Sequence, residues 1–237
     1  MGRLSEEELL ALIDNPGRVQ QFAFGLLTET QMNTIVTPMA DDDIPVELQE
    51  IAGKWRNLAV NCMYAGPIAW RVKAGFRPDN DCMFGYFNPK SKAIHFSGRC
   101  FTCLPTVDGI YFWIPRLIRD CFNKTYTEQT HCLAELAKSY HLPEDHGYGI
   151  WPGDLSLVVA LVLAHFKRSG DRIPGKGKFA RLHTQHTVKD TLSRESYLRI
   201  SVGDFVRDKK LSCISKFGDD DRDPDLSCFP VGEGILY

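Results

Sequence analysis

The apolar segment LSLVVALVLAHF, residues 155–166, most constrains how this chain can fold. Apolar side chains occupy nearly every position, so a helix formed here has almost no polar face and must be buried on most sides. Asp154 is a typical N-cap before it, and Gly170 is a typical C-terminal stop after it. The segment is much shorter than the roughly 20 residues needed to cross a bilayer. It therefore predicts the central helix of a buried core, and no membrane span.

Helices are predicted in three other regions. Ser5 followed by Glu8 forms a capping box, and apolar positions continue to Leu26, which indicates a helical hairpin at the N-terminal end. Between residues 48 and 63 apolar side chains recur with a helical period, and the stripe that they form must face a core. A similar pattern over 127–140 predicts another helix. The stripe over 48–63 consists of Leu48, Ile51, Ala52, Trp55, Leu58, Ala59, Cys62 and Met63.

Short β-rich runs fill most of the remaining sequence. IAWRV, CMFGYF, AIHFSG and GIYFWI follow one another from residue 66 onward, separated by turn sequences such as RPDND and NPKSK. They predict an antiparallel β-meander. SYLRISVG and KLSCISKF predict a closing β-hairpin. The expected fold class is α+β, with N-terminal helices, a central meander, a buried C-terminal helix and this hairpin.

Length and composition allow two domain organisations. The chain has 237 residues, 43% of them hydrophobic, which is enough for one large core or two smaller ones. LPEDHGYGIWPGD is rich in Pro and Gly and is the best candidate boundary. It would separate a domain over 1–142 from a second over 154–237. One continuous domain fits the sequence equally well.

The eight cysteines would suit a disulfide framework in a small secreted domain, but two features of the chain argue against one. The first residues are acidic and periodic, unlike a secretion signal, and the chain is larger than disulfide-rich secreted domains usually are. We therefore expect reduced thiols in a cytoplasmic protein. Cys62, Cys121 and Cys132 lie among apolar residues, where cysteine behaves as a small hydrophobic side chain.

Charge is strongly segregated along a chain whose net charge is only −2. Residues 167–189 combine seven cationic side chains with one aspartate, three glycines and a proline. Such a stretch predicts a loop whose amides and cations bind an anion, which would be a nucleic acid, a phosphate ligand or an acidic protein surface. The predicted anion-binding residues are Lys167, Arg168, Arg172, Lys176, Lys178, Arg181 and Lys189.

Two other interpretations of this segment stay open. The helix dipole alone would favour Lys167 and Arg168 at a helix C-terminus. Residues 219–237 carry six acidic side chains against one arginine, and they could fold back on the basic loop and mask it. The leading hypothesis is an intracellular binding protein that uses this cationic loop.

The same segment contains the basis for an enzyme hypothesis. His183 and His186 are three residues apart, and imidazoles near cationic side chains could exchange protons with a phosphorylated or nucleic-acid substrate. The spacing places both on one face of a helix and on opposite faces of a strand. The sequence therefore does not decide whether the protein is an enzyme.

A third hypothesis is a zinc-stabilised interaction module. Cys100 and Cys103 form the only CxxC, a spacing at which two thiolates can share a tetrahedral zinc ion. A second CxxC is absent, and the completing ligands would come from Cys82, His95, Cys121, His131 or Cys132. The sequence identifies neither the ligand of the protein nor its oligomeric state.

Overall fold

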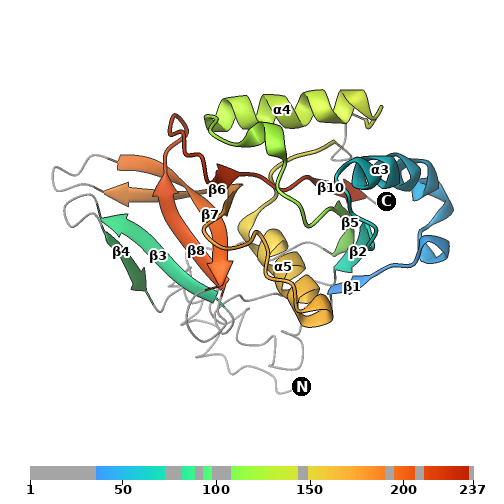
Figure 1. Cartoon of the computed structure of the whole chain (residues 1–237), viewed down its shortest axis with the longest axis horizontal. Coiled ribbons are helices and arrows are strands. Elements are labelled where there is room, and N and C mark those ends of the chain that lie inside the picture. The colour runs from blue at the N-terminus through green and yellow to red at the C-terminus, as the bar shows by residue number, and fades with distance from the viewer. Residues whose placement is uncertain are drawn as a thin grey trace, which may run out of the picture.

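The computed structural model describes residues 36–72, 82–88, 93–97, 108–143, 149–189, 195–205 and 211–234. These ranges contain α-helices and two β-sheets whose strands pair mainly antiparallel, which confirms the α+β class. Figure 1 shows the larger sheet on the left and the smaller one on the right. The predicted helical hairpin from Ser5 to Leu26 lies outside the described residues.

The smaller sheet has four antiparallel strands. Its order is β1-β2-β5-β10. The strands are β1 (Val36–Pro38), β2 (Ala69–Val72), β5 (Gly109–Trp113) and β10 (Val231–Gly234).

The larger sheet has six strands in the order β4-β3-β8-β7-β6-β9. Strand β3 pairs in parallel with β8, and β6 pairs in parallel with β9, whereas the other pairs are antiparallel. The strands are β3 (Cys82–Asn88), β4 (Ala93–Ser97), β6 (Phe179–Lys189), β7 (Glu195–Phe205), β8 (Leu211–Phe217) and β9 (Leu226–Ser227).

The four runs predicted as a meander are all strands, but they do not form one meander. Strands β3 and β4 pair as consecutive strands, whereas β2 pairs with β5 in the other sheet. Alternate side chains of β5 enter two different cores, Ile110 and Phe112 on one face and Tyr111 and Trp113 on the other. Because β5 is buried on both faces, the packing of both cores determines which strands pair with it. The local sequence pattern of β5 does not indicate those pairing partners.

The predicted closing hairpin is confirmed, and it continues into a strand that the sequence did not predict. Strands β7 and β8 pair antiparallel as expected. The segment 167–189 is not one loop, because its second half is β6, which pairs with β7. Ala180 and Leu182 alternate into the core, while the register shifts between Arg181 and Gln185. Burial of these side chains stabilises a strand directly after the glycines that had suggested a loop over the whole segment.

Three α-helices match the prediction: α3 (Gln49–Asn61), α4 (Tyr126–Ser139) and α5 (Leu155–Ser169). The described residues also form the 3-10 turns η1 (Asp41–Asp43), η2 (Val46–Leu48) and η3 (Arg119–Cys121). Helix α5 ends at Gly170, which has a left-handed φ of 76°. Asp154 occupies the N-cap, but its carboxylate accepts no helix amide. The amide of Leu155 donates instead to Thr184 Oγ1 at 2.9 Å.

Helix α5 lies between the two sheets (Figure 1). Its buried side chains contact strands of both, including Trp113 of β5 and Ile200 of β7. A second core joins α3 and α4 to the opposite face of the smaller sheet. Among the described residues no helix has the length and apolar character needed to cross a membrane.

Both sheets combine strands from the two sides of the predicted boundary near 143–153. Strand β10 pairs with β5, and β3 pairs with β8. The division into 1–142 and 154–237 remains a prediction.

Candidate functional site

The predicted cationic loop is divided among three places in the fold. Lys167 and Arg168 are exposed in the last turn of α5. Arg172 and Lys176 are exposed in the connection from α5 to β6. Lys178 immediately precedes β6, and Arg181 and Lys189 lie within it. The backbone of Lys189 pairs with that of Glu195, and the side chain of Lys189 is not among those that the structure describes. The predicted residues therefore do not form one continuous binding loop.

The acidic segment after β8 contacts part of this basic segment. Lys178 Nζ lies 2.6 Å from Asp225 Oδ1. Arg181 is fully buried, and its guanidinium donates to the Asp221 carbonyl at 2.7 Å. The acidic segment thus folds back on two of the predicted cations. For Arg168, Arg172 and Lys176, by contrast, the described part of the chain supplies no ion pair.

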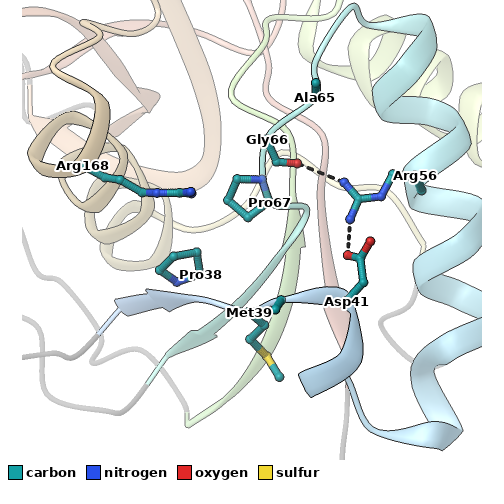
Figure 2. A pocket seen from close by; sticks show the side chains of 9 residues that line it. Pro38, Met39, Asp41, Arg56, Ala65, Gly66, Pro67 and Arg168 are labelled. Atoms are coloured by element: carbon teal, nitrogen blue, oxygen red, sulfur yellow. Dashed lines mark hydrogen bonds and ion pairs between the residues drawn. The ribbon is translucent and has the colours of Figure 1, made fainter.

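Arg168 instead lines a pocket of about 460 Å³ at the junction of α3, α5 and the smaller sheet. Figure 2 shows Arg168 and Arg56 reaching toward the pocket from opposite sides, with Pro38 and Pro67 between them. The lining residues are Pro38, Met39, Ala40, Asp41, Arg56, Ala65, Gly66, Pro67 and Arg168.

Arg56 is held in a defined orientation on α3. Its Nη1 donates to the Gly66 carbonyl at 3.0 Å, and its Nη2 forms an ion pair with Asp41 of η1 (Figure 2). A Cβ at Gly66 would lie 2.2 Å from the Tyr64 hydroxyl oxygen, so a larger residue there would require the Tyr64 side chain to move. The turn therefore places the carbonyl that orients Arg56. The guanidinium keeps further N–H donors for a ligand.

Arg168 is not restrained in this way. No hydrogen bond or ion pair links its guanidinium to another of the described residues. Arg56, Arg116 and Arg168 all act electrostatically on Tyr64, where they partly offset the burial that raises the pKa of its phenol. Three guanidinium groups therefore contribute positive potential to this region, and an anion entering the pocket would be attracted by all of them.

The two predicted histidines lie in the same strand, β6. His183 is exposed in β6, and its Nδ1 lies 2.8 Å from the Tyr126 hydroxyl oxygen. The Arg199 guanidinium stacks 3.8 Å from the Tyr126 ring centroid, and burial raises the pKa of that tyrosine. The backbone of His186 pairs with Leu198, and its side chain lies outside the description. That the two imidazoles act together as acid and base stays a prediction.

The zinc hypothesis falls on residues that are not described. Cys100 and Cys103 lie in the range 98–107, outside the described residues. Within the described ranges, no group of three or more His, Cys, Asp and Glu side chains is placed to hold a metal ion. The zinc module stays a prediction.

Sequence reasoning did not identify Arg56, Asp41 or Gly66. Arg56 lies on a helix for which the sequence pattern indicated only the buried apolar face. Asp41 belongs to a segment that the sequence suggested is an acidic connector. The Gly66-Pro67 dipeptide marks a turn. Nothing in the local sequence, however, relates that turn to a helix C-terminus a hundred residues later.

Comparisons with protein-family models, with curated proteins and with solved structures find no match to this chain. The function is therefore inferred from the charge and geometry of the chain itself.

Proposed function

We propose that this chain is a binding protein for a small anionic ligand, which it holds in the pocket between Arg56 and Arg168. The observation that carries the proposal is the approach of two guanidinium groups to one pocket from separate helices. Arg56 is restrained, and Arg168 has no hydrogen-bond partner among the described residues. Phosphate-bearing and carboxylate-bearing ligands share the required chemistry. The proposal retains Arg168 from the predicted cationic loop and adds Arg56 to it.

Guanidinium groups suit this role because their planar donors match two oxygens of a phosphate or carboxylate at once. Arg56 is already oriented by Asp41 and Gly66, so less conformational entropy is lost when it binds. Asp41 neutralises part of the charge of Arg56. Arg168 therefore offers a ligand guanidinium donors that are not used by the described protein groups.

The size of the pocket favours a small ligand over a polymer. Its volume of about 460 Å³ lies within the roughly 300–1,000 Å³ usual for small-molecule sites. Nucleic-acid binding depends on many cations along an extended surface. Lys178 and Arg181 are already engaged by the acidic segment, which shortens any such surface. Nucleic acid and acidic protein surfaces remain the competing partners.

We also expect the protein to act in the cytoplasm. Six cysteines lie in the described ranges, and all are free thiols. Free thiols persist in reducing compartments.

Calorimetric titration tests the proposal with inorganic phosphate, a nucleoside monophosphate, citrate and a short oligonucleotide. Arg168→Ala should weaken binding of a small anion by roughly 10-fold or more, because one charge-assisted hydrogen bond contributes about 1.5–3 kcal/mol. Arg172→Ala is the matched control, since Arg172 is equally exposed and does not line the pocket. It should change the affinity less than about twofold.

Three outcomes would contradict this proposal. Binding of no member of the panel at low ionic strength would remove anion binding altogether. Equal losses in Arg168→Ala and Arg172→Ala would place the site on the exposed loop and not in the pocket. Preference for the oligonucleotide over every small anion would favour a nucleic-acid partner.

One contact supports the enzyme alternative. A hydrogen bond to Tyr126 orients the exposed His183 imidazole, as a general acid or base requires. His183→Gln should leave anion affinity unchanged if the protein only binds. Hydrolysis of a phosphomonoester or phosphodiester that disappears in His183→Gln would support the enzyme alternative instead.

A further inference from the structure

Three cysteines that are distant in the sequence meet beneath α4. Cys121 ends η3, Cys132 lies in α4, and Cys228 follows β9. The thiol of Cys121 is in side-chain hydrogen-bond contact with both Cys228 and Cys132. Cys121 and Cys132 lie before the predicted boundary near 143–153, whereas Cys228 lies in the acidic C-terminal segment.

The three thiols differ in access to solvent. Cys121 and Cys228 are fully buried, whereas Cys132 is half-buried. Lys124 Nζ lies 2.9 Å from Cys132 Sγ, so an ammonium group stands beside the most accessible sulfur. Reactive cysteines typically combine partial exposure with a neighbouring cation. Cys132 has both features.

Cys121 is the thiol best placed to react with a modified Cys132. Its hydrogen bond with Cys228 lowers the pKa of the Cys121 thiol, and the charge of Lys124 adds to that effect, although burial opposes it. The carbonyl of Cys121 accepts from Gln129 Nε2 at 2.8 Å, and its Sγ lies 3.9 Å from the Gln129 carbonyl oxygen. These contacts hold η3 against the first turns of α4, so the two sulfurs stay close to each other.

Metal binding does not explain the cluster. The described residues contain no group of three or more His, Cys, Asp and Glu side chains that could hold a metal ion. Oxidation is a chemistry open to adjacent thiols without a metal.

We propose that Cys132 is an oxidative modification site for a hydroperoxide, and that Cys121 resolves the oxidised residue as a disulfide. In the first step the Cys132 sulfur attacks the O–O bond. For hydrogen peroxide this gives the sulfenic acid and one water molecule, and peroxide is reduced. In the second step Cys121 attacks the Cys132 sulfur, which forms the Cys121–Cys132 bond and releases a second water molecule. The inference is independent of the anion pocket.

Peptide mapping of the full chain tests this proposal directly. Protein treated with a modest excess of hydrogen peroxide is alkylated with iodoacetamide and digested with trypsin. Cys121 and Cys132 lie in separate tryptic peptides, DCFNK and TYTEQTHCLAELAK. Their linked pair, two hydrogen masses lighter than the sum, should become the dominant Cys132-containing species and disappear on treatment with dithiothreitol.

Two variants assign the roles of the thiols. In Cys121→Ser the sulfenic acid on Cys132 should accumulate and be trapped by dimedone, because its resolving partner is missing. Cys62→Ser is the matched control. Cys62 is also half-buried, but burial raises the pKa of its thiol. This variant should form the linked pair as the unaltered chain does, and Cys62 should remain alkylatable in the unaltered chain.

The proposal fails if Cys132 stays reduced while Cys62 is oxidised. It also fails if Cys132 proceeds to sulfinic acid without a linked peptide, or if Cys121 links only to Cys228. None of these results bears on anion binding, which is measured without oxidant.

Discussion

Arg181 shows how a cation in a basic segment can be structural. Its side chain is fully buried in β6, where its guanidinium donates to the carbonyls of Asp221 and Lys124 and to the side chain of Gln129. Burial lowers the pKa of the guanidinium. These acceptors belong to two separate segments, so one side chain of the larger sheet joins the acidic segment and the start of α4.

Replacing Arg181 should therefore reduce stability and leave anion binding unchanged. Arg181→Ala leaves buried carbonyl groups without donors and creates a cavity, which we expect to lower the free energy of unfolding by roughly 2–4 kcal/mol. Urea denaturation followed by tryptophan fluorescence measures the change. Arg172→Ala, an exposed change in the same segment, should stay within about 0.5 kcal/mol. Similar values for the two variants would show that the contacts of Arg181 contribute little.

Among the secondary-structure elements, helix α5 is terminated by a glycine whose backbone conformation other residues rarely adopt. Gly170 adopts a φ of 76°, and a Cβ there would meet nothing within 4 Å. The requirement for glycine is therefore a property of the backbone and not of packing. The same left-handed residue turns the chain away from the helix just after Arg168, and the side chain of Arg168 remains beside the pocket.

Two glycine substitutions should change stability in opposite directions. Gly170→Ala forces an L side chain into the left-handed region and should destabilise the protein by about 1 kcal/mol. Gly53→Ala places a methyl group on the exposed face of α3, where it also meets nothing within 4 Å. It should stabilise the protein by about 0.5–1 kcal/mol. Thermal unfolding of both variants is sufficient, and a stabilising Gly170→Ala would contradict the backbone argument.

At the scale of the whole molecule, the chain crosses repeatedly between its two sheets. Strand β10 completes the smaller sheet beside β5, while β3 joins the larger sheet beside β8. Helix α5 packs on both sheets. Hydrogen bonds and core contacts therefore connect residues from both sides of the predicted boundary near 143–153.

Cleavage at that boundary should not separate the chain. A specific protease site inserted after Pro143 would divide the protein into two pieces that share both sheets, and we expect them to elute together from a gel-filtration column near the 26.8 kDa of the intact chain. Elution of two folded pieces at their separate masses would instead support independent domains over 1–142 and 154–237. Circular dichroism of each fraction distinguishes folded pieces from unfolded ones.

The helices were predictable because their information is local. The stripe from Leu48 to Ala59 and the apolar run from Leu155 to Phe166 indicate the faces that must be buried, whatever the partners are. Met63, the last residue of the predicted stripe, is instead exposed, because α3 ends at Asn61. The strand β6 was missed because the glycines and lysines just before it, in residues 170–178, resemble a loop, and burial against neighbouring strands stabilises β6 itself. The candidate site was found in part. Arg168 was predicted, whereas Arg56 was not.

The α+β class, the positions of α3, α4 and α5 and the segregation of charge follow from the amino-acid sequence alone. The pairing of the strands, the cations that contact the acidic segment and the cation that lines a pocket depend on how the elements pack together. The two sets differ in the range of the interactions involved. Hydrophobic periodicity, capping and backbone preference act over a few neighbouring residues, whereas Arg56 and Arg168 meet because two cores pack their helices around the same sheet.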